Sequence, residues 1–424
     1  MGQLFQDKFK QQVGATFFTQ LIVLVLSFTN TVIIARWLGP EGKGVIALAL
    51  LVPGMIGLFL SGGIGVANVY FASSRHLDVP ILTENSVKFA ILSTILGMFV
   101  VGTLVATGWL SVLVPGISLW LIILAMVGLP FGLLSGHLSA ILQGLQRIIM
   151  VNMIHLVQSV LTLILTLLLV IGFRMGLLGA LLSSLGAGIV SPIIMIVILR
   201  REGGVFKPSW NTSAMRSTLS FGLKGHIGNL LQFFNYRLDT FFVNYFIGPG
   251  AVGIYSVSVG LAELLWHFPN AVGFVIFPKA AATKPEVMNI FTPRVFRITL
   301  GVTTLGAIGL VLLGKPFIQL IYSLAFVGAY VPMLALLPGV VLLGGAKVLT
   351  NEIAGRGYPH YNSLSAGVAF ILTVIFDLIL IPRFGILGAA LASTIAYTTI
   401  FFAAAGFYLM ISRRTTEFNF ERYR

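Results

Sequence analysis

The stretch Phe173–Ser184, FRMGLLGALLSS, returns 209 residues later as Pro382–Ser393, PRFGILGAALAS, and seven of its twelve positions are identical. The identities include both arginines, Arg174 and Arg383. Repetition at a fixed offset indicates that one structural unit occurs twice in the chain.

A second pair of segments lies at the same offset. The segment LGPEGKGV, from Leu38, aligns with IGPGAVGI, from Ile247, and both contain Gly-Pro. A weaker third match, at an offset of 208, aligns Pro130 with Pro338. Chance identity among Leu-, Gly- and Ala-rich segments does not explain one offset at two equivalent loops. We therefore predict two homologous halves.

The composition places this repeat in a membrane. Hydrophobic residues make up 57% of the 424 positions and charged residues only 9%, whereas a soluble domain has roughly 45 to 50% and about 25%. A spanning helix needs about 20 apolar residues. The sequence therefore predicts an all-α polytopic membrane protein of about twelve transmembrane helices with no separate soluble domain.

Short polar segments separate the charge-free apolar runs, and these runs form two sets of six expected helices. An even number per half brings both halves into the membrane from the same side, so an axis along the membrane normal should relate them, and such halves enclose a central cavity. We predict an N-terminal lobe over 1–209 and a C-terminal lobe over 210–424. The expected helices are 14–36, 44–72, 87–109, 117–143, 149–172 and 176–199 in the first lobe, and 217–247, 251–278, 296–314, 331–352, 363–381 and 385–411 in the second.

The net charge of +14 carries information on orientation. With both termini placed in the cytoplasm, the inner segments collect 18 basic residues and the outer segments only five. Basic residues concentrate on the cytoplasmic side of membrane proteins. The sequence therefore predicts a protein of the inner (plasma) membrane with both termini inside.

Several classes of function are disfavoured. The chain has no cysteine, which excludes disulfides and thiolate metal sites. It has no GxxxxGK[ST] loop for ATP, no HExxH zinc motif and no nucleophile elbow, and it lacks the aromatic-interleaved basic patches of nucleic-acid binders. We predict no catalytic site, no metal site and no cofactor. A membrane-embedded polymerase or glycosyltransferase is an alternative, but it should carry a polar outer loop with acidic residues.

Three segments carry a family resemblance that covers nearly the whole chain: ARWLGPEGKGVIAL (Ala35–Leu48), YRLDTFFVNYFIGPGAVGIYSVSVGLAELL (Tyr236–Leu265) and IFPKAA (Ile276–Ala281). With them the chain resembles the polysaccharide-transporter branch of the multidrug, oligosaccharidyl-lipid and polysaccharide exporter superfamily. The resemblance implies a MATE-like, two-lobe fold. It also implies a flippase that carries an undecaprenyl-pyrophosphate-linked oligosaccharide from the cytoplasmic to the outer leaflet for surface polysaccharide synthesis.

The same resemblance suggests partners and one alternative. The expected partners are the polyprenyl-pyrophosphate-linked glycan and membrane lipids, with a polysaccharide polymerase and glycosyltransferases as further candidates. The drug and cation antiporters of the same superfamily share the two-lobe plan. A cation-coupled multidrug antiporter is therefore the alternative function.

Ionisable residues at membrane depth mark functional sites by default, because they are costly unless they face a cavity or a partner. They gather in the second half. A pyrophosphate in a low-dielectric cavity requires cations, so Arg237 and Lys347 are its candidate ligands. The competing interpretation pairs Arg237 with Glu263 or Asp377.

Glu263 and His267 are four residues apart on one expected helix and should share a face. With Asp239 they are the candidate site for coupling to H⁺ or Na⁺, and the competing interpretation is a hydrogen-bonded packing pair. Asp377 should lie near the outer end of its helix and reach the headgroups, and His137 should snorkel toward the cytoplasm.

Four basic residues are expected at the outer mouth. They cap helix C-termini or hold the lobes together as an outer gate: Arg36, Lys43, Arg174 and Arg383. The large aromatic residues, Trp266 among them, should belong to the interfacial belt.

Overall fold

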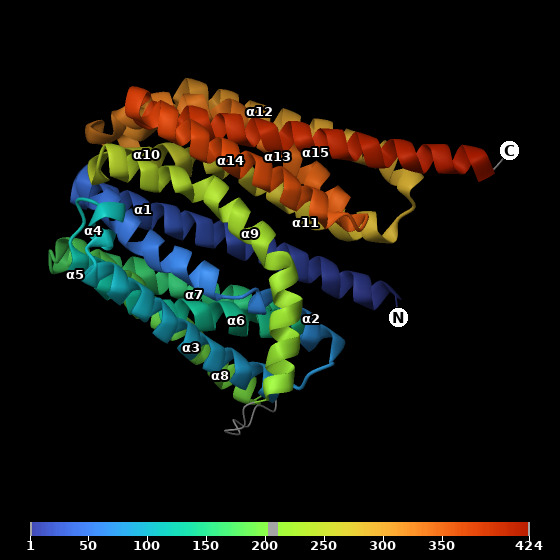
Figure 1. Cartoon of the computed structure of the whole chain (residues 1–424), viewed down its shortest axis with the longest axis horizontal. Helices are drawn as coiled ribbons and strands as arrows, with labels where there is room; N and C mark the ends of the chain where they lie inside the picture. Colours follow the sequence, from blue (N-terminus) through green and yellow to red (C-terminus); the bar gives the residue numbers. More distant parts are fainter. Residues whose placement is uncertain (1, 202–210, 423–424) are drawn as a thin grey trace. The chain divides into compact units, whose positions relative to one another are not determined.

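The computed structural model describes residues 2–201 and 211–422, and these residues are helical apart from short connections (Figure 1). No strand occurs in the described ranges. The first helices are α1 (Gly2–Leu60), α2 (Ile64–Ser74), α3 (Val79–Ala106), α4 (Trp109–Leu113), α5 (Leu119–Met126), α6 (Leu129–Gly144), α7 (Ile148–Thr166), the π-helix η1 (Leu167–Gly172) and α8 (Gly176–Arg201).

The remaining helices follow residues 202–210. They are α9 (Thr212–Phe246), α10 (Pro249–Glu263), the 3₁₀ turn η2 (Leu264–Trp266), α11 (His267–Ala282), α12 (Pro285–Ile321), η3 (Leu324–Ala329), α13 (Tyr330–Gly355), α14 (Pro359–Phe384) and α15 (Ile386–Arg422).

Ten helical segments of the described chain are long and apolar enough to cross a membrane. An all-α polytopic membrane protein is thus confirmed, while the count of twelve stays a prediction. The first segment, Phe18–Leu60, contains the kink at Gly39 that divides α1. Helix α9, which carries Lys224, Arg237 and Asp239, is expected to span but is not among the ten.

The chain forms two compact units, Met1–His226 and Ile227–Arg424. Helix α9 begins in the first unit and ends in the second. The predicted boundary between 209 and 210 falls at the edge of residues 202–210, outside the described ranges.

Each unit is held together by close helix packing. In the first unit α6 packs against α2, α3 and α8, and α7 packs against α1 and α8. Leu138, Ile141 and Leu142 of α6 are fully buried there. In the second unit α13 is the central helix and contacts α10, α11, α12, α14 and α15. Many outward-facing residues are large and apolar, as in Leu305 and Leu312 of α12, which are 69% and 70% exposed. Such a surface suits lipid rather than water.

The repeat is visible in the backbone. Gly39 (φ 67°, ψ −175°) and Gly248 (φ 114°, ψ 177°) share a positive-φ, extended conformation that is essentially restricted to glycine. Each is followed by a proline at the first position of the next helix, where proline is favoured. The two Gly-Pro segments therefore serve the same purpose in both units, which is to restart a helix after a sharp turn.

The second repeated segment is also matched in structure. A Cβ atom added to Gly388 would lie 2.2 Å from the Leu380 carbonyl oxygen, and one added to Gly179 would lie 2.9 Å from the Leu169 carbonyl oxygen. In both units, therefore, the glycine allows the last helix to touch the backbone of the helix before it.

Candidate functional site

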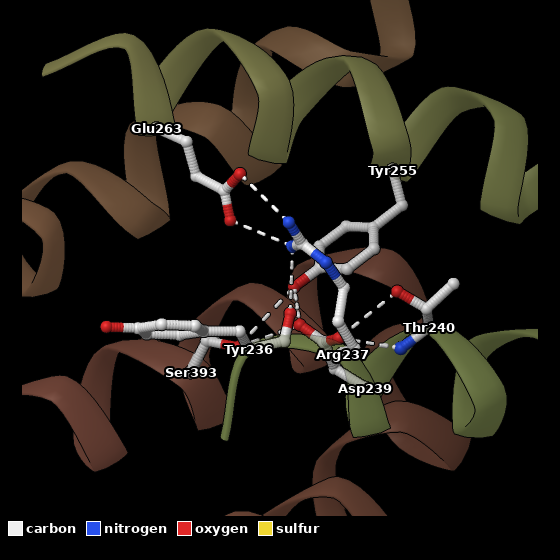
Figure 2. Close-up of polar contacts among 7 residues, drawn as sticks. All are labelled: Tyr236, Arg237, Asp239, Thr240, Tyr255, Glu263 and Ser393. Carbon is white, nitrogen blue, oxygen red and sulfur yellow. Dashed lines mark hydrogen bonds and ion pairs between the residues drawn. The ribbon is translucent and has the colours of Figure 1, made fainter. Parts of the chain in front are cut away.

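The second unit holds an ion pair between two membrane helices. The Arg237 guanidinium on α9 donates to both carboxylate oxygens of Glu263, with Nη1–Oε1 at 2.8 Å and Nη2–Oε2 at 3.2 Å (Figure 2). Nη1 also donates to the Tyr236 carbonyl oxygen at 3.0 Å. The side chains are 36% and 23% exposed. This bidentate pair is the competing interpretation that the sequence left open for Arg237.

Glu263 ends α10, and the backbone then tightens into the 3₁₀ turn η2 before α11 begins. A 3₁₀ turn advances about 120° per residue instead of about 100°. Because of this turn, the spacing of four residues does not place Glu263 and His267 on one face. No hydrogen bond joins them among the described residues, and His267 is exposed. The expected pairing is not formed.

Lys347 lies against an aromatic wall. Its Nζ is 4.9 Å from the Trp266 ring centroid and 5.8 Å from that of Tyr236, within the range of cation–π attraction. Nζ donates to Asn270 Oδ1 at 2.8 Å. Tyr397 completes the wall, with its ring 5.6 Å from Trp266 and 6.0 Å from Tyr236.

Trp266 corrects one expectation. It is only 6% exposed, and its Nε1 donates to the Val340 carbonyl oxygen at 3.3 Å. A buried tryptophan with a satisfied N–H supports the protein interior. The prediction that it anchors in the interfacial belt is wrong.

A second polar cluster lies deeper in the same unit and centres on Asp239 of α9, which is 2% exposed. Its Oδ2 accepts hydrogen bonds from the Tyr255 hydroxyl at 2.6 Å and the Ser393 hydroxyl at 3.0 Å. Its Oδ1 accepts from the Thr240 amide at 2.6 Å and hydroxyl at 3.2 Å. Figure 2 shows these partners converging on one carboxylate. Asp239 is thus held by α9, α10 and α15.

Asp377 of α14 is the neighbouring acid, and its place was not expected. It is 0% exposed, and neither carboxylate oxygen has a hydrogen-bond partner among the described residues. The expectation that Asp377 reaches the headgroups is therefore wrong.

One turn earlier on each helix, Thr373 Oγ1 of α14 donates to Asn235 Oδ1 of α9 at 3.3 Å. This bond holds the two helices together beside the acids. Two neighbouring buried carboxylates repel each other unless a proton or a cation intervenes. In the described part of the chain this is the one place where both oxygens of a fully buried carboxylate lack partners.

The other predicted residues are placed as follows. Arg36, Arg174 and Arg383 are exposed, and Lys43 is 8% exposed. Whether they form a gate depends on the relation between the two units, so that role stays a prediction. No group of three His, Asp or Glu side chains that would hold a metal ion occurs in the described ranges.

Sequence reasoning missed the partners of Asp239 because Tyr255 and Ser393 are neutral. Hydroxyls in apolar helices are common, and nothing in their spacing indicates a shared carboxylate. The repeat gave one usable signal, since Ser393 lies in the repeated segment Pro382–Ser393.

Two solved structures have the same fold. A lipid II flippase, MurJ, in its inward closed conformation matches 97% of this chain and 92% of its own with a TM-score of 0.77 and 16% identity. An inward-facing multidrug resistance MATE transporter of the MOP superfamily matches 95% and 99% with a TM-score of 0.72 and 15% identity. The predicted exporter-superfamily fold is confirmed.

Sequence comparisons agree with this assignment. A protein named as a probable flippase, AglR, of Haloferax volcanii is 29% identical over 193 residues, which is 44% of this chain and 40% of that protein. The chain thus spans about two fifths of the length of the first curated relatives that it matches. The family model described as polysaccharide biosynthesis protein matches residues 9–284, nearly two thirds of the chain. The chain therefore belongs to the polysaccharide biosynthesis protein family.

Proposed function

We propose that this protein translocates a polyprenyl-pyrophosphate-linked oligosaccharide, with undecaprenol as the lipid, from the cytoplasmic to the outer leaflet by alternating access. The glycan would serve surface polysaccharide synthesis. The protein would act in the plasma membrane with both termini inside, beside the glycosyltransferases and the polymerase of the pathway. Its role is transport and not catalysis.

The observation that carries this proposal is a polar face on the second unit. Arg237, Glu263, Asn270 and Lys347 are all partly or largely exposed, and the last three lie inside helical segments apolar enough to cross a membrane. Charged groups facing lipid are costly. This face therefore suits a hydrated cavity that takes up a charged, polar headgroup.

Within this face, Lys347 is the better ligand for pyrophosphate. No carboxylate oxygen lies within 4.0 Å of its Nζ among the described residues, and its polar contact is the neutral amide of Asn270. Its positive charge is thus available to an anion. Arg237 is already bound by Glu263, so a phosphate oxygen must displace that carboxylate before Arg237 can bind it.

The aromatic wall beside Lys347 supports a sugar-linked substrate. Of the two rings beside the cation, Trp266 is only 6% exposed, whereas Tyr236 is partly exposed. A ligand whose anionic group reaches Lys347 therefore brings its adjoining part against Tyr236. Rings and amides together suit a pyranose with apolar faces and hydroxyl groups.

Deletion of the gene tests the substrate. The deletion strain should accumulate lipid-linked oligosaccharide inside and lose surface polysaccharide, measured by lipid extraction and surface staining. Unchanged surface polysaccharide with new sensitivity to cationic dyes would favour the multidrug antiporter instead.

Complementation then tests the site. Lys347→Met should fail to restore surface polysaccharide, whereas Lys347→Arg, which keeps the charge, should restore part of it. Lys315→Met, outside the polar face, is the matched control. Western blotting of membranes must show equal amounts of each variant. Full restoration by Lys347→Met would remove Lys347 from the substrate site.

We further propose that Asp239 and Asp377 couple transport to an H⁺ or Na⁺ gradient. The unpartnered oxygens of Asp377 fit a cation or a proton, because a buried carboxylate demands compensation. With Asp239 and the Asn235 amide oxygen they offer the oxygen ligands that hard cations prefer. A bound cation would supply positive charge between the two acids. A conformation that binds it better would then be favoured on the side of high cation concentration.

Proteoliposomes test this coupling. Transport of lipid-linked oligosaccharide should respond to an imposed Na⁺ or pH gradient, and Asp377→Asn should abolish that response. Asp78→Asn, in the connection before α3, is the control. Gradient-driven transport that survives Asp377→Asn would contradict the proposed coupling site while leaving the flippase function standing.

A further inference from the structure

The first unit contains a buried polar cluster that the proposed function does not use. It joins Asn68 of α2, Ser86 of α3 and His137 of α6, which are 1%, 1% and 2% exposed. Asn68 Nδ2 donates to Ser86 Oγ at 2.8 Å and to the His137 carbonyl oxygen at 3.1 Å. One side chain thus ties three helices together. The expectation that His137 snorkels to the surface is wrong.

The cluster is incompletely satisfied. Neither ring nitrogen of His137 has a hydrogen-bond partner among the described residues, although the ring lies beside the Ser86 backbone. The Asn68 Oδ1 oxygen is also unpartnered. Native structures rarely bury polar atoms in this way without a reason. The closed junction thus buries two ring nitrogens and one acceptor oxygen without a complete set of hydrogen bonds.

The surroundings hold the imidazole neutral in this conformation. Phe89 of α3 lies against the ring, with centroids 6.0 Å apart. The titratable residues with described side chains on the helices packed against α6 are Tyr70 on α2, Glu84 and Lys88 on α3, His155 on α7, Arg200 and Arg201 on α8, and Arg36, Glu41 and Lys43 on α1. Glu84 Oε2 and Lys88 Nζ lie 3.9 Å apart. None of these groups makes a hydrogen bond or ion pair with the imidazole in the described structure, so a charged ring here would be disfavoured.

We infer that Asn68, Ser86 and His137 form a proton-binding site inside the first unit, whose loading favours a conformation in which the packing of α2, α3 and α6 is opened. The inference follows from the three-helix junction and its unpartnered atoms. Histidine is the side chain that changes charge near neutral pH. When it takes up a proton, the ring needs water or an acceptor on both nitrogens. The Ser86 backbone is the one acceptor beside the ring in the described structure, so at least one nitrogen would be left without a partner in the closed packing.

The direction of the effect follows from proton linkage. The open conformation binds the proton and the closed one does not, so lower pH favours opening. Below the pH at which a solvated histidine titrates, about 6.5, the open population should rise about tenfold for each unit of pH. The change should be confined to the segments around the junction.

Hydrogen–deuterium exchange of the purified full-length protein in detergent tests this inference. After correction for intrinsic exchange, amides of residues 64–74, 82–93 and 133–142 should exchange faster as the pH falls from about 8 to about 5. His137→Gln, which keeps a hydrogen-bonding side chain but cannot be charged, should remove the pH dependence. His155→Gln, an exposed histidine of the same unit, should leave it unchanged.

A second variant keeps the test decisive if His137→Gln folds poorly. His137→Asn keeps a smaller amide side chain at this position and cannot be charged. Protection at low pH should then be retained. An unchanged pH dependence in both variants would overturn the inference. No substrate is needed, so the result is independent of the proposed flippase function.

Discussion

At the scale of single residues, the second unit contains two buried carboxylates with different surroundings. Asp239 accepts four hydrogen bonds from three side chains and one amide. Asp377 accepts none in the described structure. A buried carboxylate whose oxygens all accept hydrogen bonds rigidifies its surroundings. A buried carboxylate without such bonds lowers the stability of the fold unless a proton or a cation binds it. Asp239 thus serves as the fixed member of the pair, and Asp377 as the responsive one.

This difference predicts a ligand effect on stability. If Asp377 binds Na⁺, the ion should raise the melting temperature of the wild-type protein in detergent at pH 8. A concentration about 100 times the dissociation constant gives about 2.7 kcal/mol of stabilisation. Asp377→Asn should abolish the Na⁺ response, because a neutral amide offers the ion no carboxylate ligand.

The Na⁺ measurement has a built-in control, since K⁺ at equal ionic strength reports general salt effects. A wild-type protein that melts at one temperature in both salts would exclude Na⁺ and leave the proton as the coupling ion.

A second prediction concerns Arg237. Arg237→Ala should abolish transport while leaving membrane insertion intact, because the side chain is partly exposed and its loss does not open the core. Arg237→Lys should restore little, since an ammonium cannot reproduce the two parallel hydrogen bonds of the guanidinium. Surface polysaccharide in complemented cells measures both. Normal polymer with Arg237→Ala would show that the Arg237–Glu263 pair is structural.

At the scale of elements, the repeat determines where helices touch. The glycines that return in both halves lie where a helix restarts or where two backbones meet. Such positions could be found from the sequence, because they require a particular residue type. The 3₁₀ turn η2, in contrast, was not predicted from the sequence. Residues 264–266 contain no glycine or proline, and Trp266 packs there against Tyr236 and Tyr397.

Substitution of Gly388 tests the close approach of α14 and α15. Gly388→Ala should lower the melting temperature, because its methyl group would lie 2.2 Å from the Leu380 carbonyl oxygen and force α14 and α15 apart. Gly301→Ala in α12 is the matched control, since a Cβ there meets nothing within 4 Å. In a helix interior it should be neutral or stabilise by up to about 1 kcal/mol. Equal melting temperatures for the two variants would contradict the close approach.

At the scale of the whole molecule, the two halves share a backbone pattern but not a chemistry. The 209-residue offset aligns Asp239 with Asn30 and Asp377 with Leu168. The first half thus lacks the acid pair at the equivalent place, and Asn30 Oδ1 has no hydrogen-bond partner in the described structure. The coupling proposed for the second unit has no counterpart in its repeat.

This asymmetry is testable. Asn30→Ala should keep the response of transport to an ion gradient, whereas Asp239→Ala should lose it, because only the second position carries charge. Gradient-driven transport in proteoliposomes compares them directly, with circular dichroism to show that both variants are folded. Equal loss in the two variants would mean that the halves contribute alike.

The sequence predicted the membrane class, the repeat and most helices, since hydropathy and Gly-Pro positions are local properties. It also indicated which half carries the buried charges. The sequence did not predict which side chains contact one another. Arg237 and Glu263 are 26 residues apart, and their contact depends on how α9 lies beside the end of α10. The burial of Asp377 and His137 likewise depends on which side of a helix is covered, and position along the helix does not reveal that.

The Arg237–Glu263 pair has a consequence for selectivity. Because a carboxylate from the chain already occupies the guanidinium, Glu263 acts as a resident competitor that every incoming anion must displace. A monoanion offers Arg237 no more charge than Glu263 does and gains little by the exchange. A pyrophosphate diester brings two charges and more oxygens, and it can bind Lys347 at the same time. If the proposed substrate binds here, the pair would favour a pyrophosphate over ligands with a single negative charge.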